Sequence, residues 1–271
     1  RRGADIRLFH ADAAGAVYGD FSRVENALAA RGETLVFAMN AGMYHKDRSP
    51  VGALVVDGVA TRAAVAGAGP GNFHLAPNGV FWTSLDENGA RAAHVEPTQS
   101  FLEAARSVRN ATQSGPMLVI DGRIHPKFLP DSTSLKYRNG VGVREDGSTV
   151  FAISERPVTF HAFALFMRDE MKTPNALYLD GSISRLYAPD LSRDDAGAPM
   201  GPIVGLVAPA AEGSATYIAN EGVMVSSGAL KILFDPLMED DLGVYQSPPP
   251  ALLGALKEGR APFDGVDAVF V

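Results

Sequence analysis

The chain has 271 residues, 46% of them hydrophobic and 20% charged, so it is long enough for one large domain or two small ones and too apolar to be disordered. Its net charge is −7, with lysine and arginine scattered along the sequence, which argues against binding to nucleic acid or to an anionic membrane. It contains no cysteine, which excludes disulfide bonds and thiolate metal sites.

The beginning of the chain reads as the inside of a strand. It starts at Arg1 without a methionine, and RGADIRLFH (2–10) has the pattern of a strand interior. We therefore expect that the start is cut and that a targeting segment has been lost. No apolar run approaches the roughly 18 residues that a membrane-spanning helix needs, so no membrane span is expected in this chain.

Tight turns between short strands dominate the sequence pattern. The chain holds 28 glycines and 18 prolines, and they punctuate short apolar runs. Asp-Gly or Asn-Gly pairs, which are typical of hairpin turns, occur at 57–58, 78–79, 121–122, 139–140, 146–147 and 180–181. Three hairpins are predicted on this basis: ALVVDGVATRA (53–63), MLVIDGRIH (117–125) and VGVREDGSTVFAIS (141–154).

Helices are predicted at three places. Ser22 with Glu25 forms a capping box that opens the first, and Ser100 with Glu103 opens the second, ahead of apolar residues. The segment FHAFALFMRDEM (160–171) has the periodicity of a third helix. Because strands outnumber helices and do not alternate with them regularly, the predicted fold class is α+β, a sheet-rich mixed domain with a few helices.

The composition changes near residue 210. We expect one domain over residues 1–210 and a short β-rich C-terminal segment over residues 211–271. Within that segment ATYIANEGVMVSSGALKILFDPL (215–237) starts a new set of strands, with Ser226-Ser227-Gly228 as a turn. A segment of about 60 residues is expected to be too short for an independent core.

Four glycine-containing polar turns border apolar strands: NAGMY (40–44), PNGVFW (77–82), QSGPMLVIDG (113–122) and LYLDGSISRLY (177–187). A strand that ends in such a turn displays side chains at a sheet edge, and glycine there lets a ligand approach the backbone. The turns are therefore either ordinary turns or the wall of one pocket. The candidate pocket residues are Asn40, Gly42, Asn78, Gly79, Ser114, Gly115, Asp180 and Ser182.

Three of the candidates carry charge or can transfer a proton. Asp180 is delivered by an apolar strand, and a carboxylate there has either a chemical task or a structural place in the turn. Arg138 can hold a phosphate through two hydrogen bonds or form a surface ion pair. His161, at the start of the third helix, can act as an acid or base or simply cap and pack.

The other five histidines are dispersed and show no metal-ligand spacing. No metal site and no cofactor are therefore predicted from the residues, and a need for a divalent cation stays open.

In this order the blocks NAGMY (40–44), NGVF (78–81), QSGPMLVIDG (113–122), RNGVGV (138–143) and LDGSIS (179–184) resemble the phosphodiester glycosidase family, over about residues 5–210. That resemblance implies cleavage of a sugar from a phosphate diester, with release of the sugar and a phosphomonoester. The substrate would be a small carbohydrate phosphodiester or glycan. The resemblance also implies an exported or periplasmic protein.

By the same resemblance, Asp180 would be the acid or base or would hold the sugar hydroxyls, and Arg138 would neutralise the diester. Asn40, Asn78, Ser114 and Ser182 would orient the sugar and the phosphate. A glycosidase commonly needs a second carboxylate, for which Asp121 and Glu155 are candidates.

One departure from the family pattern concerns the turn after Asp180, where Gly-Ser-Ile-Ser replaces a longer glycine run. Ile183 could reshape the pocket, which keeps a non-catalytic glycan or cell-envelope binding module as an alternative. Residues 215–271 resemble the opening strands of a metallo-β-lactamase-fold hydrolase. A further alternative is therefore that the chain is a fragment of a fusion with such an enzyme, whose zinc ligands would lie beyond Val271. The simpler interpretation of residues 215–271 is a hairpin extension of the first domain.

Overall fold

The structure is a computed structural model that describes residues 5–67, 69–103, 107–210, 213–219, 222–228, 230–236 and 248–270. The chain divides into two compact units, residues 1–208 and 209–271, which we take one at a time. Strands prevail over helices in both, so the expected sheet-rich α+β class is confirmed. In the part of the chain that the structure describes, no helix is long and apolar enough to cross a membrane.

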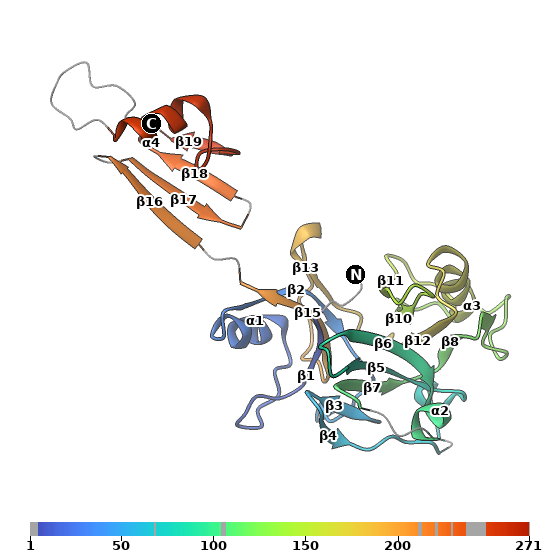
Figure 1. The fold of residues 1–271 in the computed structure, drawn as a ribbon. Coiled ribbons are helices and arrows are strands. Elements are labelled where there is room, and N and C mark those ends of the chain that lie inside the picture. Colours follow the sequence, from blue (N-terminus) through green and yellow to red (C-terminus); the bar gives the residue numbers. More distant parts are fainter. Residues whose placement is uncertain are drawn as a thin grey trace. The chain divides into compact units, whose positions relative to one another are not determined.

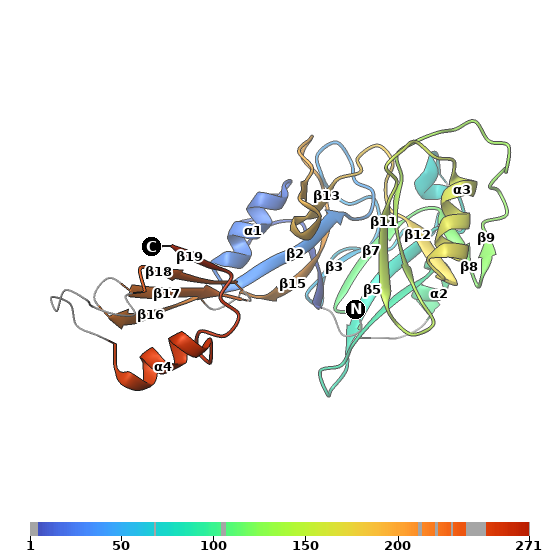
Figure 2. The ribbon, with the colours of Figure 1, turned by 90° about the horizontal axis from the view of Figure 1, so that it is seen from above.

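Three sheets build the first unit (Figures 1 and 2). The first sheet has the order β1 (Asp5–Phe9), β15 (Ile203–Pro209), β2 (Glu33–Asn40), β13 (Leu186–Ala188) and β14 (Arg193–Asp194). The second has the order β11 (Thr149–Ile153), β10 (Asn139–Val143), β12 (Asn175–Tyr178), β8 (Met117–Ile120) and β9 (Arg123–Ile124). The third has the order β4 (Val59–Arg62), β3 (Leu54–Val56), β7 (Asn110–Ser114), β5 (Gly79–Leu85) and β6 (Arg91–Pro97).

The inner faces of the three sheets share one hydrophobic core. Its buried side chains come from all three, for example Leu8 from the first sheet, Leu177 from the second and Phe81 from the third. A buried leucine or phenylalanine contributes roughly 1.5–3 kcal/mol to stability, so this shared core fixes the sheets against one another. The sheet edges, where the polar turns lie, are thereby held in fixed positions.

Helices cover the outer faces of these sheets. Figure 1 shows α1 (Phe21–Ala29) beside β2, and α3 (Phe160–Leu165) beside β8 and β12. Phe21 and Val24 of α1 pack on the first sheet, and Phe163 of α3 packs on the second. Phe101 of α2 (Thr98–Glu103) packs against Trp82 of the third. Short helical turns lie at Asn72–His74 and Pro189–Leu191.

The three predicted hairpins are confirmed. β3 pairs with β4, β8 with β9, and β10 with β11, each pair antiparallel. In the first two hairpins the turn aspartates, Asp57 and Asp121, have φ of 48° and 46° and are followed by glycines at 81° and 76°. Both residues of these turns thus adopt the left-handed conformation that Asp-Gly pairs favour. By contrast, Asn139 and Gly140 lie within β10 rather than in a turn.

The predicted helices are present with shifted starts. Asp20, not Ser22, caps α1, because its carboxylate accepts a hydrogen bond from the Ser22 amide at 3.1 Å. The second helix begins at Thr98, two residues before the predicted Ser100, while Ala104 and Ala105 lie outside the described residues. The third is capped by Thr159 and changes at Phe166 into a π-helical turn that runs to Glu170.

The second unit is a four-stranded sheet with one helix. The strand order is β16 (Gly213–Ala219), β17 (Gly222–Ser227), β18 (Leu230–Phe234) and β19 (Ala268–Phe270), with β19 parallel to β18. Helix α4 (Pro250–Glu258) covers one face, as Figure 2 shows. Ile218, Met224, Leu233, Leu256 and Phe263 form a core of its own, contrary to the expectation that the segment is too short for one.

Candidate functional site

Three strand ends of the first unit meet at Asp180. Asn40 is the last residue of β2, Asn139 is the first of β10, and Asp180 follows β12 by two residues. The Asn139 side chain donates to Asn40 Oδ1 at 2.5 Å and accepts from the Asp180 amide at 2.8 Å. The Arg185 amide also donates to Asn40 Oδ1, at 3.0 Å. Two buried asparagines therefore fix the backbone that carries Asp180.

The Asp180 carboxylate is buried without a cationic partner. Its residue is 8% exposed, and Oδ1 accepts hydrogen bonds from the Gly181 and Ser182 amides at 2.6 and 2.7 Å. Burial raises the pKa of Asp180, and these amide hydrogen bonds only partly offset the effect. None of the ion pairs recorded among the described residues includes this carboxylate. A desolvated, unpaired carboxylate is a group suited to proton transfer.

Other carboxylates near this sheet edge are paired. Asp20 forms an ion pair with Arg185 at 3.0 Å, and Arg193 pairs with both Asp195 and the exposed Glu155. Asp121, the other candidate for a second carboxylate, is exposed and contacts Asn175 at the opposite end of β12. Five residues of extended chain span about 16 Å, which is too far for Asp121 to act beside Asp180.

Arg138 is a buried cation with an unfilled donor. It is 1% exposed, and its Cζ lies 3.6 Å from the centroid of the Phe160 ring. Its Nε donates to the Val158 carbonyl at 2.9 Å and its Nη2 to the Ser134 carbonyl at 3.1 Å. Nη1 has no hydrogen-bond partner of good geometry among the described residues, although the Tyr178 hydroxyl lies close to the guanidinium, and burial lowers the pKa of the guanidinium. Because arginine stays charged in proteins, the site holds a positive charge without a carboxylate beside it.

Tyr178 links Arg138 to the Asp180 turn. Its ring centroid lies 5.5 Å from Arg138 Cζ, and its hydroxyl would be 1.9 Å from a Cβ atom added to Gly181. Residue 181 must therefore be glycine for this tyrosine to fit. Burial raises the pKa of Tyr178, the Arg138 charge lowers it and the Asp180 charge raises it, so the phenol keeps its proton.

The two predicted substrate-binding serines, Ser114 and Ser182, hold Asp180 through hydrogen bonds that involve backbone groups. The Ser114 hydroxyl donates to the Leu179 carbonyl at 2.7 Å, which holds the residue before Asp180. Ser182 contributes its amide to the carboxylate. These contacts orient the aspartate, and the roles of both residues toward a substrate stay predictions.

The remaining predicted turn residues lie around β5 and β7. The Asn78 amide donates to the Phe73 carbonyl at 3.1 Å, and a Cβ on Gly115 would lie 2.8 Å from Asn78 Cβ. Gly79 pairs with Ser114 in the β5–β7 ladder. The Gly42 amide donates to Thr112 Oγ1 at 3.0 Å. Close packing of this kind explains the glycines, and no hydrogen bond recorded for these four residues reaches Asp180.

His161 stands apart from this network. It is the second residue of α3 and is half-buried. Among the described residues, no hydrogen bond or ion pair is recorded between His161 and Asp180 or Arg138. Likewise, within the described ranges no group of three or more histidine, aspartate and glutamate side chains is placed to hold a metal ion.

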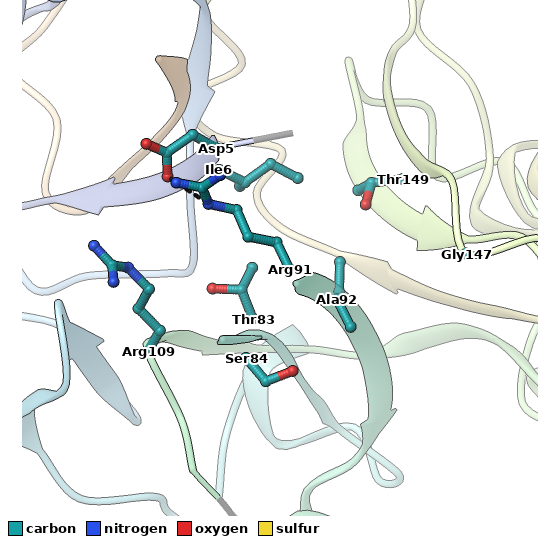
Figure 3. A pocket seen from close by; sticks show the side chains of 10 residues that line it. Asp5, Ile6, Thr83, Ser84, Arg91, Ala92, Arg109, Gly147 and Thr149 are labelled. Carbon is teal, nitrogen blue, oxygen red and sulfur yellow. Dashed lines mark ion pairs between the residues drawn. The ribbon is translucent and has the colours of Figure 1, made fainter. Parts of the chain in front are cut away.

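Two hollows of the first unit are lined by residues other than the predicted site residues. One is a cavity of about 20 Å³, where the Arg91 guanidinium lies 3.4 Å from the Asp5 carboxylate. Figure 3 shows this pair together with Arg109, which also lines the cavity. That volume suffices for little more than one water molecule. A groove of about 940 Å³ runs past α1, β1 and Val59. None of the predicted site residues lines either hollow.

The fold defines a sheet-rich α+β domain. Its candidate site combines a desolvated carboxylate with a buried arginine that has no carboxylate partner. The family model described as phosphodiester glycosidase matches residues 33–232, and the chain belongs to this family. The match runs beyond the expected limit near residue 210 and into β18. The family match includes residues 215–232, and the resemblance of residues 215–271 to a metallo-β-lactamase-fold hydrolase is not supported.

Two similar proteins illustrate the relationship. The uncharacterized protein YigE of Escherichia coli K12 is 31% identical over 182 residues, which cover 67% of this chain and 69% of YigE. The catalytic domain of zebrafish N-acetylglucosamine-1-phosphodiester alpha-N-acetylglucosaminidase, auto-inhibited by its pro-peptide, aligns with a TM-score of 0.52 at 12% identity. That alignment covers 74% of this chain and 72% of the zebrafish chain, and at such low identity it establishes the fold alone.

Two residues of the site were not singled out from the sequence: Asn139 and Tyr178. Asn139 follows Arg138 in the RNGVGV block, but its Asn-Gly pair has the pattern of a turn. Tyr178 is the last residue of β12 and lies two residues before Asp180. In extended chain, residues two apart face the same side, and this spacing is the signal that could have revealed Tyr178.

Proposed function

We propose that the protein hydrolyses a sugar–phosphate diester, cleaving the bond between the sugar C1 carbon and the phosphate oxygen. The observation that carries the proposal is the Asp180 carboxylate, which is buried, unpaired with any cation among the described residues and fixed by two amides. Membership of the phosphodiester glycosidase family supports this reaction class.

The chemistry of the leaving group explains why one carboxylate can be enough. A phosphomonoester has a second pKa of about 6, so it departs as an anion far more readily than a sugar alcohol does. It needs no proton from a general acid, unlike the leaving group of an ordinary glycoside. A second unpaired, buried carboxylate beside Asp180 is therefore not required, which agrees with the ion pairs of Asp20 and Glu155.

In the proposed step, Asp180 acts as a general base. A water oxygen attacks C1 while the carboxylate takes a proton from that water, and the electron pair of the C1–O bond leaves with the phosphomonoester. A base is most effective when its pKa lies near the working pH, and burial moves the pKa of Asp180 in that direction. The Asn139 and Ser114 contacts hold the carboxylate in place.

We propose that Arg138 supplies the positive charge that stabilises the departing phosphate. Its guanidinium is too enclosed to form an exposed clamp, but it carries no neutralising carboxylate among the described residues. In a low-dielectric environment such a charge stabilises the extra negative charge that develops on the departing phosphate.

The alternative of a non-catalytic binding module rests on Ile183. This side chain packs against the hydrophobic cluster of Phe21, Tyr187 and Met200, beside α1. Ile183 therefore has a structural role in this cluster. This supports the catalytic proposal over a turn that is altered for glycan binding alone.

Turnover in water enriched in ¹⁸O tests the proposal. The full chain is incubated with a panel of sugar-1-phosphodiesters, and both products are examined by mass spectrometry. Label in the sugar supports cleavage of the C1–O bond. Label in the phosphomonoester would show a phosphodiesterase instead, and saturable glycan binding without any product would favour the binding module.

We also propose that the protein is exported, as its family resemblance implies. Fractionation of cells that express the tagged full-length gene tests this, and recovery of the protein from the cytoplasm alone would contradict it.

A further inference from the structure

Two buried donors next to Asp180 have nothing to bond. They are Nδ2 of Asn40 and the hydroxyl of Tyr44, and neither has a hydrogen-bond partner among the described residues. Asn40 is completely buried, and its Oδ1 is already occupied by Asn139 and the Arg185 amide. Buried polar groups in native proteins are nearly always paired, so two unfilled donors four residues apart in the chain, both near Asp180, indicate a missing acceptor.

The position of the Tyr44 ring is fixed by its neighbours. A Cβ added to Gly201 would lie 2.5 Å from Tyr44 Cγ, so the ring rests directly on that glycine. The Ala41 amide, three residues earlier, donates to the Pro202 carbonyl at 2.8 Å, and Arg48 Cζ lies 5.6 Å from the ring centroid. These contacts hold the hydroxyl in place before any ligand binds.

The Tyr44 hydroxyl remains a donor. Burial raises the pKa of Tyr44, and the charge of Asp180 raises it further. The Gly201 amide lies near the phenol oxygen without the geometry of a hydrogen bond, and as an N–H it could not accept the phenol proton. The phenol proton therefore has no acceptor among the described residues.

The turn after Tyr44 carries positive charge. Tyr44 and Pro50 form a β-bridge, and the His45 amide donates to the Ser49 carbonyl at 2.8 Å, which closes the turn. Lys46 and Arg48 lie in it together with one carboxylate, Asp47, whose Oδ1 accepts from the Ser49 amide and hydroxyl at 3.0 and 2.6 Å. An anion is therefore the acceptor that this part of the site favours.

We infer that Asn40 Nδ2 and the Tyr44 hydroxyl form a subsite that donates two hydrogen bonds to a phosphoryl oxygen of the substrate. This inference rests on the proposed function, because the phosphoryl oxygen is that of the scissile diester. A phosphoryl oxygen only accepts hydrogen bonds and carries charge, which matches two donors beside a basic turn. Tyr44 is thereby a substrate-binding residue that decides between a phosphodiester and a neutral glycoside.

Binding of inorganic phosphate to the Tyr44→Phe variant tests the inference without relying on turnover. The variant removes one oxygen and keeps the ring on Gly201 and beneath Arg48. Isothermal titration calorimetry of the full chain at constant ionic strength is expected to give a Kd for phosphate about ten- to a hundredfold higher than that of the parent, the usual effect of losing a hydrogen bond to a charged group. Tyr217→Phe, which removes the same atom from an exposed tyrosine of the second unit, is the matched control and is expected to bind phosphate as the parent does.

Equal phosphate affinity of Tyr44→Phe and the parent would overturn the inference, and so would a parent that binds no phosphate. With a sugar-1-phosphodiester, the variant is expected to show a higher KM while its thermal unfolding midpoint stays unchanged. Gly201→Ala, which keeps the hydroxyl but displaces the ring, is expected to raise KM in the same way. A parent that binds phosphate through Tyr44 but releases no sugar would contradict the proposed reaction and leave the anion subsite standing.

Discussion

Replacing Gly181 by alanine places a methyl group against a buried hydroxyl. The new Cβ would lie 1.9 Å from the Tyr178 hydroxyl and 3.1 Å from its Cζ, and the tyrosine is 1% exposed. The ring cannot retreat easily because Phe160 and Arg138 pack on it. Overpacking of this kind costs about 1–3 kcal/mol, which for a unit of this size lowers the unfolding midpoint by about 2–12 °C.

Removing the hydroxyl should relieve most of this strain. In the Tyr178→Phe background the nearest ring atom is Cζ at 3.1 Å, a tight contact that a small shift can accommodate. We therefore expect a double-mutant cycle of Gly181→Ala and Tyr178→Phe, measured by chemical denaturation, to give a favourable coupling free energy of about 1 kcal/mol or more. Strictly additive effects would refute the packing of Tyr178 on the turn of Asp180.

Four further predictions concern the site and its supports. The kcat/KM for a sugar-1-phosphodiester should rise with pH through the pKa of Asp180, which burial raises above the ordinary 3.8, and a pH–rate profile whose acid limb lies at or below 3.8 would contradict this. The folded state binds the Asp180 proton more tightly than the unfolded state, so the protein loses stability as pH rises from the unfolded-state pKa of Asp180 to its folded-state pKa. Asp180→Asn should therefore unfold at a higher temperature than the parent at pH 7. An equal or lower unfolding midpoint would argue against an uncompensated buried charge. Arg138→Met should lower kcat/KM at least about tenfold in steady-state assays while the protein stays folded by circular dichroism, whereas unchanged kinetics would remove Arg138 from the site. Asp20→Ala should lower the free energy of unfolding by about 1–2 kcal/mol, because α1 loses its cap and Arg185 loses its partner, and Asp20→Asn should recover part of this loss in urea titrations; identical losses for the two variants would contradict the role of the cap.

Local signals predicted the strands and turns well. The Asp-Gly pairs at 57–58 and 121–122 mark hairpins because aspartate and glycine tolerate the left-handed conformation, whatever lies around them. The same logic misplaced Asn139, since an Asn-Gly pair inside a strand has the same letters as one in a turn. Its place in β10 is decided by pairing with β11 and β12, which the local sequence does not encode.

The site itself depends on contacts between distant segments. Asn40 and Asn139 are 99 residues apart, and only the packing of the first sheet against the second brings them together. Asp180 was accessible from the sequence because a wholly apolar strand precedes it. Asp121 follows an equally apolar strand, yet the antiparallel pairing of β8 with β12 puts it at the opposite end. Tyr44 could not be predicted as a site residue from the sequence, because the position of its hydroxyl depends on packing of the ring against Gly201, far along the chain.

The most direct test of the account is the kcat/KM of Asp180→Asn for a sugar-1-phosphodiester, measured beside Asp121→Asn. The two variants make the same chemical change at an aspartate that follows an apolar strand, but at opposite ends of β12. We expect a loss of about a hundredfold or more for Asp180→Asn, with Asp121→Asn close to the parent. Parental activity in a folded Asp180→Asn variant, or an equal loss in both, would contradict it.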